Sequence, residues 1–87
     1  MRLDKWLKVS RLIKRRTVAK EVCDGGRAFV NGRPAKAGTE VAPGDRVRLS
    51  LGNRTIEVEV LATPPTVSAD GATDLYRRLS EELTDTR

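Results

Sequence analysis

The sequence predicts a small α+β domain in which two short basic helices pack on an antiparallel sheet, followed by a short C-terminal helix. Three observations predict it. Apolar residues recur at helical spacing up to residue 24, the pattern then alternates as in strands, and helical spacing returns after residue 73. With 87 residues and 3% aromatic side chains, the chain has room for one domain with an aliphatic core and no deep substrate cavity.

The composition excludes several kinds of site. The chain contains no histidine and one cysteine, Cys23, so it offers no disulfide, no common zinc site and no imidazole acid–base chemistry. We therefore expect no metal, no cofactor and no catalytic residue, and we interpret Cys23 as a buried apolar side chain. Apolar runs reach only three residues and no signal-like segment follows Met1, which predicts a cytoplasmic protein without a membrane partner.

The net charge of +5 is unevenly distributed along the chain. Residues 1–36 hold eleven basic and three acidic side chains, a net charge of +8, and the rest of the chain has a net charge of −3. The basic side chains in this segment repel one another, and binding of a polyanion reduces this repulsion. In the cytoplasm the usual polyanion is nucleic acid. A basic face that is merely solvated is the alternative.

The first predicted element is an amphipathic helix over residues 2–8. Apolar residues at helical spacing form one side of it, and among them Trp6 is interpreted as core rather than as a platform for a stacked base. Basic residues in three-residue steps form a ridge beside this side: Arg2, Lys5 and Lys8. Asp4 is placed to pair with Lys8 four residues on and to orient the ridge.

A basic turn leads into a second predicted helix, from residue 15 or 16 to Asp24. Its apolar stripe consists of Val18, Ala19, Val22 and Cys23. The pair Gly25-Gly26 ends the helix. Arg16 and Lys20 have like charge four residues apart, which costs an isolated helix about 0.2–0.5 kcal/mol. A phosphate bound between them would offset this repulsion.

Two hairpins follow the helices. Asn31-Gly32 is a strong two-residue turn signal between strands at 28–30 and 33–35. Pro43-Gly44-Asp45 is a second turn, and the residues after it alternate between apolar and polar in two runs, 46–51 and 55–60. With Gly52-Asn53 as the turn between these runs, residues that face each other have numbers that sum to 105.

This register predicts a structural role for two arginines. Arg48 opposes Glu57 and Arg46 opposes Glu59, while the other face of the hairpin is apolar. We therefore leave Arg46 and Arg48 out of the predicted binding site. Phe29, in the first hairpin, is expected to lie in the core.

The last part of the chain is predicted to be separate from the domain. Two prolines after residue 62 end the sheet, so we assign residues 1–62 to the domain, 63–72 to a polar linker and 73–87 to a short C-terminal helix or tail. Three leucines at four-residue spacing predict the helix: Leu75, Leu79 and Leu83. We expect them to dock on the chain's own domain rather than on a partner, since they would otherwise be exposed.

Three stretches together resemble the RNA-binding domain named after small-subunit ribosomal protein S-four. They are residues 2–7 (RLDKWL), 26–32 (GRAFVNG) and 43–47 (PGDRV). The resemblance covers residues 1–61 and implies the S-four (αL-motif) fold, with RNA bound by the helical pair. Because few aromatic residues are available for stacking, we expect recognition through the placement of phosphates and the shape of the groove.

Most members of this family carry the domain on a larger enzyme or ribosomal protein. The opening 21 residues and the short acidic tail resemble its stand-alone RqcP group, which acts in ribosome-associated quality control. This resemblance implies a non-catalytic factor whose partners are the ribosomal RNA of stalled large subunits, peptidyl-tRNA and an RqcH-type elongation factor, with support of alanine tailing of the nascent chain. We expect a monomer.

Three other functions stay open. A heat-shock member of the family, which also acts on obstructed large subunits, generally carries a longer basic C-terminal extension than this chain has, and it implies subunit recycling instead. An RNA-modifying enzyme, or a remnant of one, would need an acid–base pair in a cleft, and none is evident. A protein or membrane adaptor would place recognition in the leucine stripe of the tail.

The binding residues are expected within the first 36 positions. By the resemblance, Arg2 and Arg16 match the positions that grip ribosomal RNA, and Lys5, Arg15 and Lys20 match less sharply. Arginine suits this role because its planar fork makes bidentate phosphate contacts. The complete predicted RNA-binding set is Arg2, Lys5, Arg11, Lys14, Arg15, Arg16, Lys20 and Lys36.

Overall fold

The computed structural model describes residues 1–65, 71 and 74–83. In chain order its elements are α1 (Leu3–Val9), α2 (Arg16–Val22), the π-helical turn η1 (Cys23–Arg27), β1 (Ala28–Val30), β2 (Arg33–Pro34), β3 (Arg46–Leu51), β4 (Arg54–Val60) and β5 (Tyr76–Leu83). The strands form a five-stranded antiparallel sheet in the order β2-β1-β3-β4-β5. The predicted α+β class, with two short helices on an antiparallel sheet, is confirmed.

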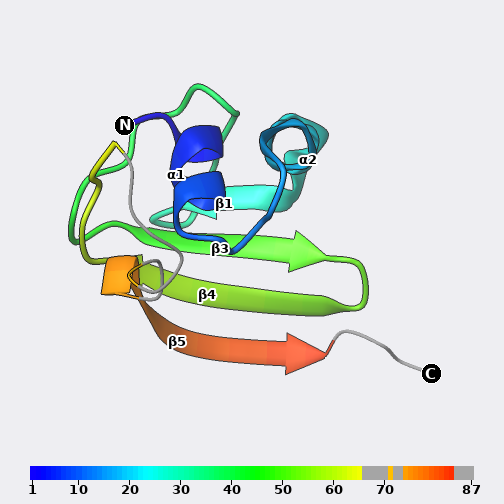
Figure 1. The fold of residues 1–87 in the computed structure, drawn as a ribbon. Coiled ribbons are helices and arrows are strands. Elements are labelled where there is room, and N and C mark those ends of the chain that lie inside the picture. The colour runs from blue at the N-terminus through cyan, green and yellow to red at the C-terminus, as the bar shows by residue number, and fades with distance from the viewer. Residues whose placement is uncertain (66–70, 72–73, 84–87) are drawn as a thin grey trace.

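The two helices lie over the β1 and β3 side of the sheet and leave β5 at the far edge (Figure 1). The core between them is built from aliphatic side chains around Trp6, which is fully buried. Its indole Nε1 donates a hydrogen bond to the Ala62 carbonyl oxygen at 3.0 Å, so the ring ties α1 to the end of β4. Trp6 is therefore core, as predicted. None of the helices among the described residues could cross a membrane.

Glycine and asparagine set the turns where the sequence predicts them. Gly26, with φ of +82°, ends the helical run that begins with α2. Asn31 and Gly32 have φ of +53° and +83°, the backbone that a two-residue hairpin turn between twisted strands requires. The predicted register of the second hairpin is confirmed at every pair, from Arg46 opposite Glu59 to Leu51 opposite Arg54.

The ion pairs predicted across this hairpin are not formed, although the residues do face one another. Glu59 instead accepts a hydrogen bond from Arg77, which β5 places directly opposite it. Within the described ranges, neither Arg46 nor Arg48 forms an ion pair with a carboxylate. The neighbouring strand therefore competes for Glu59, which the two-strand pattern could not show.

Phe29 lies outside the core, so its predicted burial is wrong. It is partly exposed and sits between Ala28, which is fully buried, and Val30, which packs against the core. Successive side chains of a strand point to opposite faces, so a β1 that buries Ala28 and Val30 turns Phe29 to the other face of the sheet, beside Arg48.

The predicted C-terminal helix is wrong over Tyr76–Leu83, which form strand β5. This strand pairs antiparallel with β4, from Tyr76 opposite Val60 to Leu83 opposite Arg54, with a register shift between Glu57 and Val58. Pairing satisfies the backbone groups along the open edge of β4, and this tertiary gain exceeds the local helical preference of the leucine spacing.

The predicted docking of the leucine stripe is only partly realised. Leu75 is buried, as predicted, but Leu79 is exposed. The predicted linker 63–72 and tail 73–87 fall partly on residues outside the described ones, namely 66–70, 72–73 and 84–87. The domain division at residue 62 stays a prediction.

Candidate nucleic-acid interface

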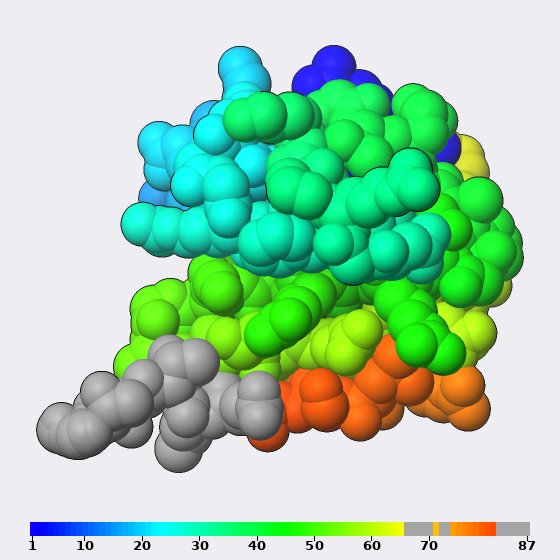
Figure 2. Space-filling view, turned by 180° about the vertical axis from the view of Figure 1, so that it is seen from behind, coloured from blue at the N-terminus to red at the C-terminus, as the bar shows by residue number. Residues whose placement is uncertain are grey.

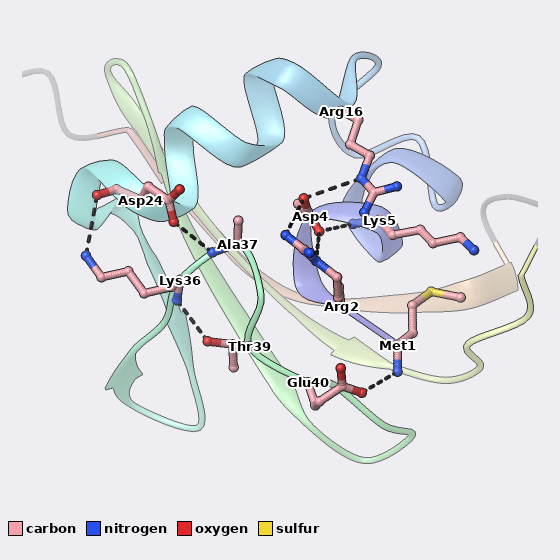
Figure 3. A network of polar contacts seen from close by, with 10 residues as sticks. All are labelled: Met1, Arg2, Asp4, Lys5, Arg16, Asp24, Lys36, Ala37, Thr39 and Glu40. Carbon is pink, nitrogen blue, oxygen red and sulfur yellow. Dashed lines mark hydrogen bonds and ion pairs between the residues drawn. The ribbon is translucent and has the colours of Figure 1, made fainter.

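Two arginines that are 14 positions apart in the sequence meet where α1 and α2 lie side by side. Arg2 is the N-cap residue of α1, and Arg16 is the first residue of α2. Figure 3 shows that both side chains turn toward Asp4, in the first turn of α1. We call Arg2, Asp4 and Arg16 the Asp4 cluster.

The carboxylate of Asp4 accepts hydrogen bonds from both arginines. Arg2 donates from Nε to Oδ1 at 3.2 Å and from Nη2 to Oδ2 at 3.4 Å, and Arg16 donates from Nε to Oδ2 at 3.3 Å. The backbone N–H of Lys5 adds a fourth bond to Oδ1 at 2.8 Å. The predicted pairing of Asp4 with Lys8 is therefore wrong, because Asp4 is directed inward between the helices.

Asp4 carries a stable negative charge in this position. Its side chain is 3% exposed, and burial by itself would raise its pKa. The hydrogen bond and charge of Arg16, the charge of Arg2 and the Lys5 N–H outweigh burial and hold the pKa of Asp4 below its ordinary value. The carboxylate is therefore ionised at neutral pH.

The two guanidinium groups still offer most of their donors outward. The side chains of Arg2 and Arg16 are 49% and 48% exposed. Of the five N–H groups on each, Arg2 uses two and Arg16 uses one, so seven have no acceptor among the described residues. With two cations and one anion, the Asp4 cluster has a net charge of +1 and a surplus of donors, which suits a phosphate.

Backbone hydrogen bonds hold the segment around Arg2 in place. Leu3 N–H donates to the Thr39 carbonyl oxygen at 2.8 Å, and Val41 N–H donates to the Met1 carbonyl oxygen at 2.9 Å. The amino nitrogen of Met1 also lies 2.9 Å from Glu40 Oε1 (Figure 3). Sequence reasoning missed this anchoring, because it joins residues nearly 40 positions apart with no local pattern.

The other predicted residues occupy two different places. Four are exposed on the turn between the helices or on α2: Arg11, Lys14, Arg15 and Lys20. Lys5 is partly buried on α1. Lys36 lies apart from the Asp4 cluster (Figure 3), with Nζ 3.5 Å from the Asp24 carbonyl oxygen. The structure therefore brings Arg2 and Arg16 together and leaves Lys36 at the C-terminal end of the α2 helical run.

Arg11 has a backbone conformation that is unusual for its residue type. It follows the C-cap of α1, Ser10, with φ of +65°, a region where glycine is common and other residues are strained. Its N–H bonds to the Lys8 carbonyl oxygen at 3.1 Å, and its side chain is exposed. The sequence predicts Arg11 as an RNA-binding residue but does not predict this backbone conformation.

The described residues contain little that would support other chemistry. Burial, followed by the charges of Asp4 and Asp24, raises the pKa of the Cys23 thiol to about 11, so it is neutral and unreactive at pH 7. No group of three or more potential metal ligands occurs within the part of the chain that the structure describes.

Comparison with known proteins gives a consistent result. The family model of the S4 domain matches residues 1–47, from Met1 to the start of β3. The "RQC P-site tRNA stabilizing factor" of Halalkalibacterium halodurans is 54% identical over 94% of this chain and 93% of its own length. The protein of the same name from Bacillus subtilis is 50% identical over 94% of this chain and 95% of its own length.

A solved structure extends the likeness to the whole fold. The heat shock protein 15 of Vibrio cholerae, described as trimeric, has a TM-score of 0.84 and 31% identity, covering 92% of this chain and 82% of that one. The family model includes both helices and the Asp4 cluster, and the two relatives each match 94% of the chain. The chain therefore belongs to the S4 domain family and, within it, to the group of the RQC P-site tRNA stabilizing factors.

Proposed function

We propose that this protein is a non-catalytic factor that binds ribosomal RNA and tRNA on large ribosomal subunits obstructed by peptidyl-tRNA. The observation that carries the proposal is the Asp4 cluster, in the most basic part of the chain: it has two half-exposed guanidinium groups, and seven of their donors have no acceptor among the described residues. The relatives at 54% and 50% identity, named for stabilizing a P-site tRNA, support the same ligand class.

The physical basis is recognition of phosphates on a folded RNA. A-form helices hide their base edges in a deep, narrow major groove, so a rigid basic ridge reads the spacing of phosphates instead. Trp6 is buried and unavailable for stacking, which favours this mode over recognition of flipped bases. If about five phosphates are neutralised, log affinity falls against log salt with a slope of about −4 to −5.

In its finer form, the proposal places the protein in cytoplasmic ribosome-associated quality control. There it supports alanine tailing of the stalled chain together with an RqcH-type elongation factor, acting as a monomer through residues 1–62. The second candidate is recycling of obstructed subunits, favoured by the fold likeness to heat shock protein 15. The higher identity to the tRNA stabilizing factors supports the first candidate.

The test is binding to purified large subunits with and without a P-site peptidyl-tRNA. We expect the tRNA to strengthen binding about tenfold or more, since it adds a second polyanion to the interface. Equal binding to both kinds of subunit, or no binding to either, would refute the proposal, because both candidate roles act on subunits that hold peptidyl-tRNA. Because the Vibrio cholerae relative is described as trimeric, the mass in solution is measured at the same concentrations.

The binding face is tested by reversing charges. Arg2→Glu with Arg16→Glu should release the protein from subunits in a sedimentation gradient. Arg54→Glu with Arg78→Glu, on β4 and β5, makes the same change in net charge and should leave the protein bound. Retained sedimentation of the first variant would show that RNA binds elsewhere.

A further inference from the structure

We infer that Asp4 is a positioning residue that sets Arg2 and Arg16 as two prongs for a single phosphate of the RNA backbone. The inference rests on the proposed function, since it assumes that the ligand is RNA. It deepens that function by assigning a role to an acidic side chain, whose charge would otherwise weaken binding to a polyanion.

The geometry shows how one carboxylate orients two cations. Arg2 and Arg16 each direct Nε to Asp4, at 3.2 Å and 3.3 Å, so the inner edge of each guanidinium is occupied. Arg2 Nη2 also lies 3.4 Å from Asp4 Oδ2, and the other terminal Nη groups have no acceptor among the described residues and stay available to a phosphate. Both long side chains are thereby ordered before any ligand arrives, which reduces the entropy lost on binding.

Burial keeps Asp4 from repelling the ligand directly. Its side chain is 3% exposed, whereas those of both arginines are about half exposed, so an approaching phosphate meets guanidinium groups first. With one phosphate bound, the cluster holds two positive and two negative charges in alternation. This balance leaves no uncompensated charge at the closest point of contact.

The fold has other supports, so Asp4 is more than a structural ion pair. The apolar residues of both helices that face the core are fully or almost fully buried: Leu3, Trp6, Leu7, Ala19 and Val22. The backbone on both sides of Arg2 is held by its own hydrogen bonds to residues 39 and 41. The amide oxygen of an asparagine at position 4 could still accept the Lys5 N–H bond.

The test uses the sign of a charge effect. Asp4→Asn and Glu21→Gln each remove one negative charge, and Glu21 is exposed on α2 without an ion pair among the described residues. Charge alone predicts that both variants bind large subunits more tightly than the wild type. Positioning predicts that Glu21→Gln binds as well or slightly better, while Asp4→Asn binds about tenfold more weakly.

Thermal melting shows whether Asp4→Asn folds. If it does not fold, a second variant tests the inference. Arg16→Lys keeps the charge but loses the fork that can bond Asp4 and a phosphate together, so we expect about a fivefold loss of affinity. In the double variant Asp4→Asn with Arg16→Lys, the loss of binding free energy should be smaller than the sum of the two single losses, because both substitutions disturb the same contact.

The outcomes separate this inference from the proposed function. Asp4→Asn binding as tightly as Glu21→Gln would overturn the inference, as would wild-type affinity in Arg16→Lys. If the wild type binds subunits and the Arg2→Glu with Arg16→Glu variant is released, the proposed function stands regardless of that result. Failure of the wild type to bind would overturn both.

Discussion

Two regions of this molecule hold a carboxylate between two arginines, and they differ in burial. The Asp4 cluster joins α1 to α2. The Glu81 cluster joins β4 to β5, with Arg54 Nη1 3.4 Å from Glu81 Oε2 and Arg78 bonded to Oε1. The two lie toward opposite sides of the molecule, the helices at one and β5 at the other (Figure 2).

The carboxylate side chain is 3% exposed in the Asp4 cluster and 30% exposed in the Glu81 cluster. Exposed pairs gain little net free energy because water screens them and the side chains lose entropy. A buried carboxylate with four hydrogen bonds holds its partners far more firmly. Both clusters contain two arginines, so the number of arginines does not determine whether a cationic site is rigid. Burial of the carboxylate that the arginines share determines it.

Removing each carboxylate should give the largest difference. Asp4→Ala should lower the free energy of unfolding by about 2–3 kcal/mol, because two guanidinium groups lose a buried acceptor. Glu81→Ala should lower it by less than about 0.5 kcal/mol. Urea denaturation of both variants measures this, and equal losses would contradict the comparison.

Neutralising one arginine in each cluster should affect binding unequally. We expect Arg16→Gln to lower affinity for large subunits about tenfold and to reduce the magnitude of the salt slope by about one, since one phosphate contact is lost. Arg78→Gln removes the same charge from the other cluster and should keep the slope. Titrations at three or more salt concentrations distinguish these results.

Arg11 and Asn31 both have a left-handed backbone, and substituting them should change the free energy of unfolding by less than removing Asp4 does. Arg11→Gly should raise the free energy of unfolding by about 0.5 kcal/mol, because it relieves strain that no side-chain bond offsets among the described residues. Asn31→Gly should not, since Asn31 bonds the Asp45 carboxylate at 3.1 Å and the Arg46 N–H at 2.9 Å. If the Arg11→Gly variant is more stable than the wild type but binds subunits more weakly, this result would support a contact between the Arg11 side chain and RNA.

The smallest effect is expected from pH in the neutral range. With no histidine in the chain, affinity should change less than about twofold between pH 6 and 8. The folded pKa of Asp4 lies below its unfolded value, so its contribution to stability is complete above the unfolded pKa of about 4 and is lost as pH falls through the folded pKa.

Unfolding free energies measured from pH 7 down to pH 3 test the predicted loss of the Asp4 contribution to stability at acid pH. The difference between wild type and Asp4→Asn should be constant above about pH 5 and shrink below it. A difference that grows toward acid pH would contradict the direction of the Asp4 pKa shift.

Features that depend on neighbouring residues could be predicted from the sequence. The register of β3 and β4 follows from strict alternation and a two-residue turn, and the end of the helical run that begins with α2 follows from Gly26. The basic character of the first 36 residues and the absence of imidazole chemistry are properties of composition alone. The resemblance then directed attention to Arg2 and Arg16.

Features that depend on distant residues could not be predicted. The leucine spacing of the tail indicated a helix, but the open edge of β4 offered backbone partners that made residues 76–83 a strand. Helical spacing predicts that Asp4 pairs with Lys8, because it relates only residues of the same helix, whereas docking of α2 beside α1 brings Arg16 to the carboxylate. The position of the positive charge follows from the order of the residues alone. Which of these charges are held rigid depends on packing, because only packing buries Asp4 between two segments that are distant in the sequence.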